Sequence, residues 1–152
     1  MTSIRHPGEA ARTPAFPSWL SRLLDRFRGS PMERTGRWGE GIAAKFLKRQ
    51  GYSILARNYR IRGGEADIVA TKDDWIVVVE VKARRSARFG SPEEAVDRRK
   101  THRVLKAGRA FCRSRGFSLG RFRGDVISVE RLPGQKETSV KHWPGVLVDS
   151  EA

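Results

Sequence analysis

Cysteine is nearly absent from the 152-residue sequence, since Cys112 is the only one. A single cysteine excludes an internal disulfide framework and a zinc site built on several thiolates, and it fits a reducing compartment, which we expect to be the cytoplasm. The three histidines are far apart, so no histidine metal cluster is expected. No apolar run approaches the roughly 18 residues of a transmembrane helix, and the N-terminus lacks the apolar region of a secretory signal. Stable membrane insertion is therefore not expected.

Acidic residues are also scarce relative to basic ones: 17 Asp and Glu stand against 31 Lys and Arg, a formal net charge of +14. The excess is concentrated, because residues 84–123 hold thirteen Lys or Arg and three acids, a net +10. A general solubility charge would be spread more evenly, whereas a concentrated excess is expected of a protein that binds a polyanion. Charge alone does not separate an enzyme from a structural RNA-binding protein.

The length fits one domain with extensions at its ends. We expect residues 1–35 to be a flexible extension, because four of the seven prolines lie there. It contains one short amphipathic helix, 18–28, which either packs on its own domain or meets a membrane surface or a partner groove. Residues 36–132 are the predicted main domain. Residues 133–152 are predicted to form an irregular C-terminal tail, with a short edge strand at 145–148 as one option.

Residues 65–83 are rich in β-branched side chains and predict an antiparallel hairpin with a two-residue turn at 73–74. Counting back from that turn places Asp67 directly opposite Glu80, and Lys82 lies one pleat further along the same face as Glu80. Opposed Cβ atoms in a sheet are about 4.5–5.5 Å apart. Two carboxylates that close repel each other unless something positive lies beside them.

A divalent cation would stabilise this pair of acids, because Mg²⁺ binds one or two carboxylates and keeps water in its other positions. Lys82 could then hold an attacking water or a phosphate oxygen. The alternative is an ordinary hairpin whose solvated face carries Asp67, Glu80 and Lys82 as surface charges. Six of the seven residues in 75–81 are apolar, which favours a strand covered on both faces.

Other elements are predicted around this hairpin. Residues 38–50 have the spacing of a helix that ends at Gly51, with Glu40 on the rim of its apolar stripe, facing partly inward. The alternative for Glu40 is an exposed acid that favours the helix dipole. Strands are expected at 52–60 and 121–130.

A second helix begins at the capping box of residues 91–94 and is expected to run to residue 115, before Gly116. One of its faces is basic and is either a solvated face or a surface for a nucleic-acid backbone. Lys100 falls within its apolar stripe, so this side chain either snorkels to solvent or meets an acid. The cations predicted to contact nucleic acid lie on this helix and on the segment before it: Arg84, Arg85, Arg88, Arg98, Lys100, Arg103, Lys106, Arg109 and Arg113.

The order of these features is an acid on a first helix, an Asp on one strand, Glu-Val-Lys on the next and then a capped basic helix. This order resembles the PD-(D/E)XK nuclease superfamily. More closely, five motifs within residues 36–130 resemble the uncharacterised bacterial YraN-like family of predicted endonucleases, which are distantly similar to archaeal Holliday-junction resolvases. The motifs are Gly39-Glu40, Gly51-Tyr52, Arg57-Asn58-Tyr59-Arg60, Gly64-Glu65-Ala66-Asp67-Ile68-Val69-Ala70 and Val79-Glu80-Val81-Lys82.

The resemblance implies an α/β fold of the restriction-endonuclease-like kind, a central mixed sheet with an antiparallel hairpin core flanked by helices. It implies a metal-dependent endonuclease that hydrolyses phosphodiester bonds in DNA, including branched or otherwise structured DNA, with Mg²⁺ or Mn²⁺ as cofactor. DNA is then a more natural partner than RNA, and a homodimer is left open. A non-catalytic basic module that binds nucleic acid is the alternative function. The implied catalytic residues are Glu40, Asp67, Glu80 and Lys82, and the implied metal ligands are Asp67, Glu80 and the main-chain carbonyl of Val81.

Two positions depart from the pattern of those families. Ala66 precedes Asp67 where the superfamily's nominal motif has proline, and residues 122–125 read Phe-Arg-Gly-Asp in place of the commoner Arg-Phe-Asp. For Asp125 two interpretations stay open, a structural pairing with Arg123 or a further carboxylate near the site. No serine lies beside a histidine, so no covalent nucleophile is indicated.

Overall fold

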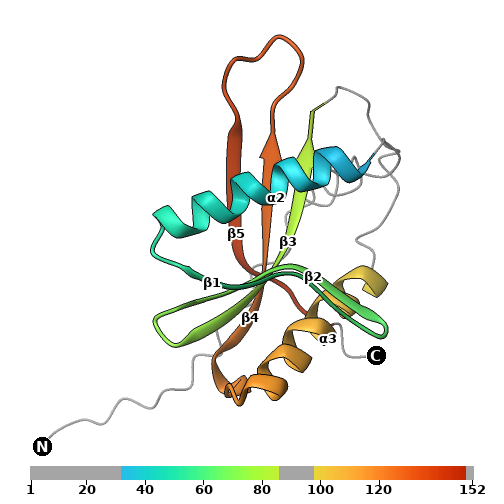
Figure 1. Cartoon of the computed structure of the whole chain (residues 1–152), viewed down its shortest axis with the longest axis vertical. Helices are drawn as coiled ribbons and strands as arrows, with labels where there is room; N and C mark the ends of the chain where they lie inside the picture. Colours follow the sequence, from blue (N-terminus) through green and yellow to red (C-terminus); the bar gives the residue numbers. More distant parts are fainter. Residues whose placement is uncertain (1–31, 86–97, 150–152) are drawn as a thin grey trace, which may run out of the picture.

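The computed structural model describes residues 32–85 and 98–149 (Figure 1). The helix predicted at 18–28, the capping box at 91–94 and Arg88 lie outside the described residues. Within the described ranges, no helix is long and apolar enough to cross a membrane. The elements are α2 (Met32–Arg49), β1 (Ser53–Ile61), β2 (Gly64–Lys72), β3 (Trp75–Arg84), α3 (Arg98–Arg115), the short 3₁₀ helix η1 (Leu119–Arg121), β4 (Phe122–Glu130) and β5 (Ser139–Leu147).

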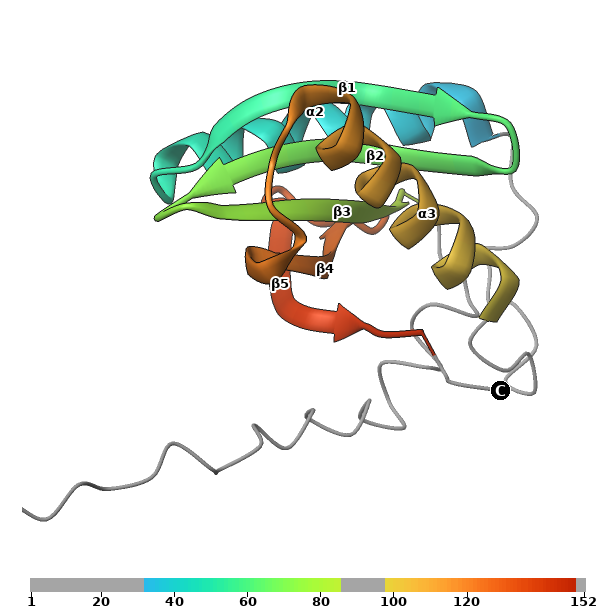
Figure 2. The same ribbon diagram turned by 90° about the horizontal axis from the view of Figure 1, so that it is seen from below.

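The strands form one five-stranded mixed sheet in the order β1-β2-β3-β4-β5. Neighbouring strands are antiparallel except β3 and β4, which are parallel. Parallel neighbours need a crossover connection, and α3 lies in that connection. Helices α2 and α3 cover opposite faces of the sheet (Figures 1 and 2). The predicted fold class, a mixed sheet around an antiparallel hairpin with flanking helices, is confirmed.

The β2–β3 hairpin has the predicted turn and register. Asp73 and Asp74 both have left-handed φ values, 49° and 64°, as the two central residues of a tight type I′ turn require. The ladder then runs from Lys72 opposite Trp75 to Ile68 opposite Val79. The next step of the same register places Asp67 beside Glu80, as the sequence predicts.

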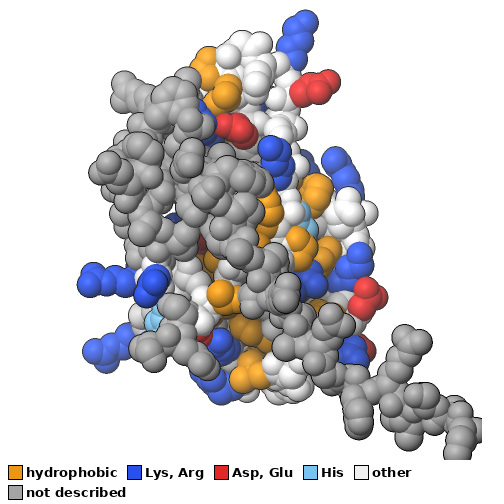
Figure 3. All heavy atoms as spheres, turned by 180° about the vertical axis from the view of Figure 1, so that it is seen from behind, with side chains coloured by type: hydrophobic (Ala, Val, Ile, Leu, Met, Phe, Trp, Pro, Cys, Tyr) orange, Lys and Arg blue, Asp and Glu red, His pale blue; other side chains and the backbone are white. Residues whose placement is uncertain are grey.

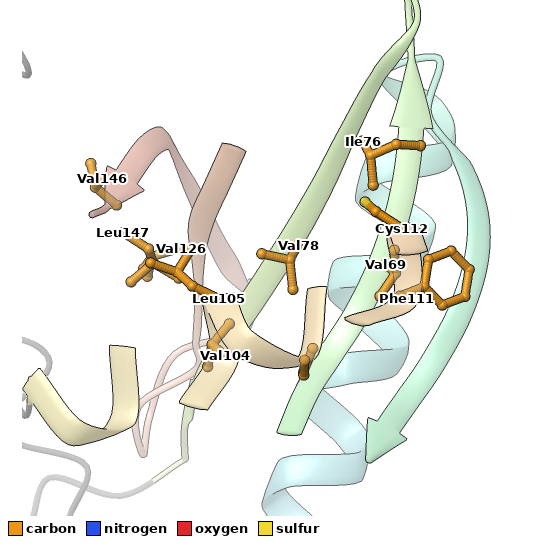
Figure 4. Packing of buried hydrophobic residues seen from close by; sticks show 12 residues of the cluster. Val69, Ile76, Val78, Val104, Leu105, Phe111, Cys112, Val126, Val146 and Leu147 are labelled. Carbon is orange, nitrogen blue, oxygen red and sulfur yellow. The ribbon is translucent and has the colours of Figure 1, made fainter. Parts of the chain in front are cut away.

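Strand β3 is covered on both faces, and residues 76–80 are all buried. Its Val78 faces α3 within an apolar cluster that includes Val104 and Phe111 (Figure 4). Val77 and Val79 instead face α2 with Ala43, Leu47 and Ile127. Because alternate residues of a strand share a face, Glu80 and Lys82 follow Val78 to the α3 side.

Gly39 lies where α2 packs tightly against the end of β3. A Cβ added there would lie 2.2 Å from the Cβ of Ala83 and 3.4 Å from its Cα, too close without a shift of the helix. This approach brings the next residue of α2, Glu40, close to the sheet.

Gly39→Ala is therefore expected to lower the free energy of unfolding by about 1–3 kcal/mol, the usual cost of overpacking. Urea denaturation of the purified protein measures it. Gly41→Ala is the matched control, because no heavy atom lies within 4 Å of a Cβ at that position. Since alanine favours helix over glycine by up to about 1 kcal/mol, the control should be neutral or stabilising. Equal stability of the two variants would contradict the packing described.

The structure differs from the sequence prediction at two boundaries. Helix α2 begins at Met32, whereas the sequence predicts a start at residue 38. Gly36 and Gly39 lower the helix propensity of this segment, so its first turns were not recognised from the sequence. Residues 133–152 do not form an irregular tail throughout, since Ser139–Leu147 pairs with β4 as the edge strand β5. Pro144 and Gly145 interrupt the alternation of apolar and polar side chains in this segment, so the sequence pattern did not predict the full strand.

Candidate active site

Asp67 lies where the β2–β3 ladder ends. Beyond the last pair, Ile68 and Val79, the backbone N–H of Val81 donates to Oδ2 of Asp67 at 2.7 Å. In an antiparallel pair the N–H and C=O of one residue point to the same side. The carbonyl of Val81 therefore faces the side on which Asp67 lies.

Glu80 is buried at the same end of the hairpin, with 5% of its surface exposed. Its Oε1 accepts hydrogen bonds from two ammonium groups, Nζ of Lys82 at 2.7 Å and Nζ of Lys100 at 2.6 Å. Lys82 reaches Glu80 because the two lie two residues apart on one face of β3, whereas Lys100 comes from α3. The sequence left two options for Lys100, exposure of its ammonium to solvent or contact with an acid, and the contact with an acid is observed.

The charges of this cluster perturb one another. Burial raises the pKa of Asp67 well above its usual value, and repulsion from Glu80 raises it further. Burial also acts to raise the pKa of Glu80, but Lys82 and Lys100 outweigh it and lower that pKa. Burial lowers the pKa of Lys82, against the opposing effect of Glu80. The two lysines thus compensate Glu80, and the charge on Asp67 is left disfavoured.

Glu40 approaches Asp67 from α2. Its Oε2 accepts a hydrogen bond from Nδ2 of Asn58 at 2.9 Å, and its charge adds to the rise in the pKa of Asp67. Asn58 has a left-handed φ of 48° within β1, a conformation that asparagine tolerates better than most residues. Sequence reasoning did not assign Asn58 a role, although an asparagine inside a strand is an unusual choice that could have drawn attention to it.

The donor set fits a hard divalent cation. Among residues 32–85 and 98–149, no three His, Cys, Asp or Glu side chains form a metal-binding group by themselves. Asp67, Glu80 and the carbonyl of Val81 nevertheless offer oxygen atoms from adjacent strands. Mg²⁺ and Mn²⁺ prefer such ligands, and Mg²⁺ commonly uses one or two carboxylates with water in the remaining positions.

Comparison with known proteins places the chain in a family. The model of the Uncharacterised protein family UPF0102 matches residues 39–129, more than half of the chain. The chain belongs to the UPF0102 family. This is the YraN family that the sequence motifs resemble. The matched region contains the candidate residues Glu40, Asp67, Glu80 and Lys82, together with Lys100.

Relatives in this family come from diverse bacteria. The UPF0102 protein of Syntrophomonas wolfei is 50% identical over 94 residues, which is 62% of this chain and 82% of the relative. That of Syntrophotalea carbinolica is 44% identical over 112 residues, 74% of this chain and 89% of the relative. That of Paenarthrobacter aurescens is 44% identical over 111 residues, which is 73% of this chain and 91% of the relative. The likeness thus spans most of each relative.

Helix α3 of this UPF0102 protein carries the predicted basic surface. Its eighteen residues include eight Lys or Arg and no acid. Figure 3 shows blue Lys and Arg side chains projecting at the edges of the face opposite to that in Figure 1. Five of the predicted nucleic-acid contacts are exposed on α3, and the four of them other than Lys100 form the group called the α3 cations: Arg98, Arg103, Lys106 and Arg113.

Other predicted contacts have different surroundings. Arg84 is buried, and its Nη1 donates to Oε1 of Glu130 at 3.1 Å, so it is less available to a phosphate group than the α3 cations. The reason is the parallel register, which aligns Arg84 with Glu130 on β4. Arg109 forms an ion pair with Asp149 and stacks on Phe122, so it is less available than the α3 cations.

Arg85 is exposed and stacks on an aromatic ring that sequence reasoning did not connect with it. Its guanidinium carbon lies 4.9 Å from the ring centroid of Trp38, and that of Arg131 lies 5.6 Å from the same centroid. The three residues are far apart in the sequence and meet only because the N-terminal half of α2 lies beside the ends of β3 and β4. No local pattern could have revealed this group.

Asp125 belongs to a structural network and not to the candidate site. Its side chain is completely buried and accepts hydrogen bonds from Nε of Arg123 at 2.9 Å and from the backbone N–H of Gly145 at 2.8 Å. Nε2 of His142 lies 2.7 Å from its other oxygen. Asp125 shares the α2 face with Ile127, whereas Glu80 faces α3. Of the two interpretations of Asp125, the pairing with Arg123 is the one observed.

Proposed function

We propose that this UPF0102 protein is a divalent-metal-dependent endonuclease that hydrolyses phosphodiester bonds in DNA. The observation that carries the proposal is the meeting of Asp67, Glu80 and Lys82 at the end of the β2–β3 ladder. Opposed carboxylates with a lysine beside them suit the hydrolysis of a phosphate ester, which needs charge neutralisation and a positioned water.

Asp67, Glu80 and the carbonyl of Val81 are the groups that would hold Mg²⁺ or Mn²⁺. When bound, such an ion polarises a phosphoryl oxygen and lowers the pKa of a bound water. The raised pKa of Asp67 supports this assignment, because burial and the charge of Glu80 both disfavour an isolated carboxylate there, and groups perturbed in this way gather at functional sites.

Lys82 is the group that would position the attacking water or a non-bridging phosphate oxygen. Its side chain is only 13% exposed, and its bond to Glu80 fixes the direction of the ammonium. Burial makes each charge–dipole interaction stronger than it would be in water. Glu40, held by Asn58, would act as an auxiliary acid near Asp67.

The α3 cations would hold the DNA backbone next to this site. Phosphate contacts by Lys and Arg supply affinity and position the substrate without reading its sequence. Branched or otherwise structured DNA is the substrate class that we propose first, on the strength of the motif order shared with resolvases.

A cleavage assay tests the proposal. Purified protein is incubated with branched, flap, duplex and single-stranded DNA, and with RNA, in the presence of Mg²⁺, Mn²⁺ or a chelator. The proposed function predicts cleavage of at least one DNA substrate that requires the metal and stops with the chelator. A non-catalytic binding module would instead bind DNA with a steep salt dependence and cleave nothing, which would contradict the proposal.

The α3 cations give a quantitative prediction for DNA binding. The double variant Arg103→Ala/Lys106→Ala is expected to weaken binding and to reduce the slope of log affinity against log salt by about 2, about 1 for each lost phosphate contact. Fluorescence anisotropy at several salt concentrations measures this slope. Lys45→Ala/Lys48→Ala removes two exposed charges from α2, across the sheet, and should leave the slope almost unchanged. Equal slopes for the two double variants would contradict a binding surface on α3.

A further inference from the structure

Lys100 enters the candidate site from outside the hairpin. Its Nζ lies 2.6 Å from Oε1 of Glu80, the same oxygen that accepts from Lys82 at 2.7 Å. The two lysines differ in their surroundings, because the Lys82 side chain is 13% exposed and that of Lys100 is 53% exposed. The ammonium of Lys82 is therefore largely shielded from solvent, whereas Lys100 reaches Glu80 from a solvent-exposed position on α3.

The charge balance of the cluster shows what an arriving metal ion would meet. Two ammonium groups lie within hydrogen-bonding distance of one oxygen of Glu80. Asp67 is the second carboxyl group of the cluster, and its pKa is affected by both Glu80 and Lys100. A divalent cation adding to this cluster would be repelled by both lysines at short range. Withdrawal of one ammonium would relieve this repulsion and favour binding of the ion.

Lys100 is the lysine that can withdraw. Its long side chain is anchored on α3, it is half exposed, and departure returns its ammonium to water at little desolvation cost. Lys82 has no such route, because its side chain is only 13% exposed.

We propose that Lys100 is the exchangeable counter-ion of the site, which competes with the divalent cation for the acid pair and, once displaced, contacts a phosphate oxygen of the substrate. This inference rests on the proposed function. The two lysines then have different roles. Lys82 stays beside Glu80, while Lys100 alternates between Glu80 and a phosphate of the substrate.

The inference predicts effects of opposite sign on metal affinity and on rate. Removing the ammonium removes a competitor, so Lys100→Met should bind Mn²⁺ about tenfold more tightly or better, a change of about 1.4 kcal/mol. At saturating Mn²⁺ the same variant should cleave DNA about tenfold more slowly or worse, because a phosphate contact is lost. A purely structural role would not strengthen metal binding.

The experiment is calorimetric titration of the full chain with Mn²⁺, followed by single-turnover cleavage. Lys100→Arg keeps the charge and should stay close to the wild type in Mn²⁺ affinity. Lys45→Met removes an exposed lysine from α2 and should leave Mn²⁺ affinity unchanged. Tighter binding by Lys100→Met alone would support the inference.

Two results would overturn it, and they are distinguishable. If the wild type binds Mn²⁺ and Lys100→Met binds it equally or more weakly, the exchange role fails while the metal site stands. If neither the wild type nor any variant binds Mn²⁺, the proposed function fails, and the role of Lys100 fails with it.

Discussion

Asp67→Asn is expected to abolish metal-dependent cleavage and, at the same time, to make the protein more stable. The loss of a carboxylate ligand should reduce the cleavage rate by about 10²–10³-fold or more. The amide keeps the shape of the side chain, and its oxygen can still accept the hydrogen bond from Val81. DNA binding through the α3 cations should persist.

The gain in stability follows from the electrostatics of the site. The pKa of Asp67 is raised by burial and by Glu80, which means that folding disfavours its charged form. Above the pKa of the unfolded chain, folding must either bury the charge of this carboxyl group or make it take up a proton, so the group lowers the free energy of unfolding, and a neutral amide avoids this penalty. The expected gain is about 0.5–2 kcal/mol, typical of substitutions that trade function for stability.

Urea denaturation without added metal, combined with the cleavage assay, tests both parts of this prediction. Asp74→Asn is the matched control, because it makes the same chemical change in the exposed turn of the same hairpin, where the side chain is 91% exposed. This control should leave rate and stability unchanged. An Asp67→Asn protein that cleaves at the rate of the wild type would exclude Asp67 as a metal ligand.

Asp125→Ala is expected to destabilise the protein more than Gly39→Ala does. The side chain is completely buried and joins Arg123 on β4 to His142 and Gly145 on β5. Removing one partner of a buried charged network typically costs about 3–5 kcal/mol. The free energy of unfolding of a small domain is about 5–15 kcal/mol in total. The variant should therefore be partly unfolded at physiological temperature.

Chemical denaturation and circular dichroism measure this effect. Glu137→Ala, which removes an exposed acid from the connection between β4 and β5, is the control and should change stability little. If Asp125→Ala folded as stably as the wild type and lost only cleavage, Asp125 would belong to the active site and the structural assignment would be wrong.

The hairpin could be predicted from the sequence because its determinants are local. A two-residue turn fixes the register of the strands beside it, and two-residue alternation fixes which side chains share a face. These rules suffice to place Asp67 beside Glu80 and to direct Lys82 to the same side. The left-handed φ values of Asp73 and Asp74 show that the turn has the geometry on which this prediction depends.

The remaining features depend on contacts between distant segments. Arg84 and Arg85 are adjacent and look equivalent in the sequence, yet Arg84 is buried because parallel pairing brings Glu130 beside it. Lys100 stood out as a cation in an apolar stripe, but only the crossing of α3 over the sheet identifies Glu80 as its partner. Strand register across a crossover and helix placement are not encoded in local periodicity.

The proposed function requires that Asp67 and Glu80, on neighbouring strands, together hold one divalent ion. Paramagnetic broadening of backbone amide NMR signals by substoichiometric Mn²⁺ tests it most directly, because broadening falls steeply with distance from the ion. We predict that the amides of Asp67, Glu80 and Val81 broaden first in the wild type and stay sharp in Asp67→Asn. Broadening centred elsewhere, such as on the acidic turn at 73–74, or the same pattern in both proteins, would contradict the proposed metal site.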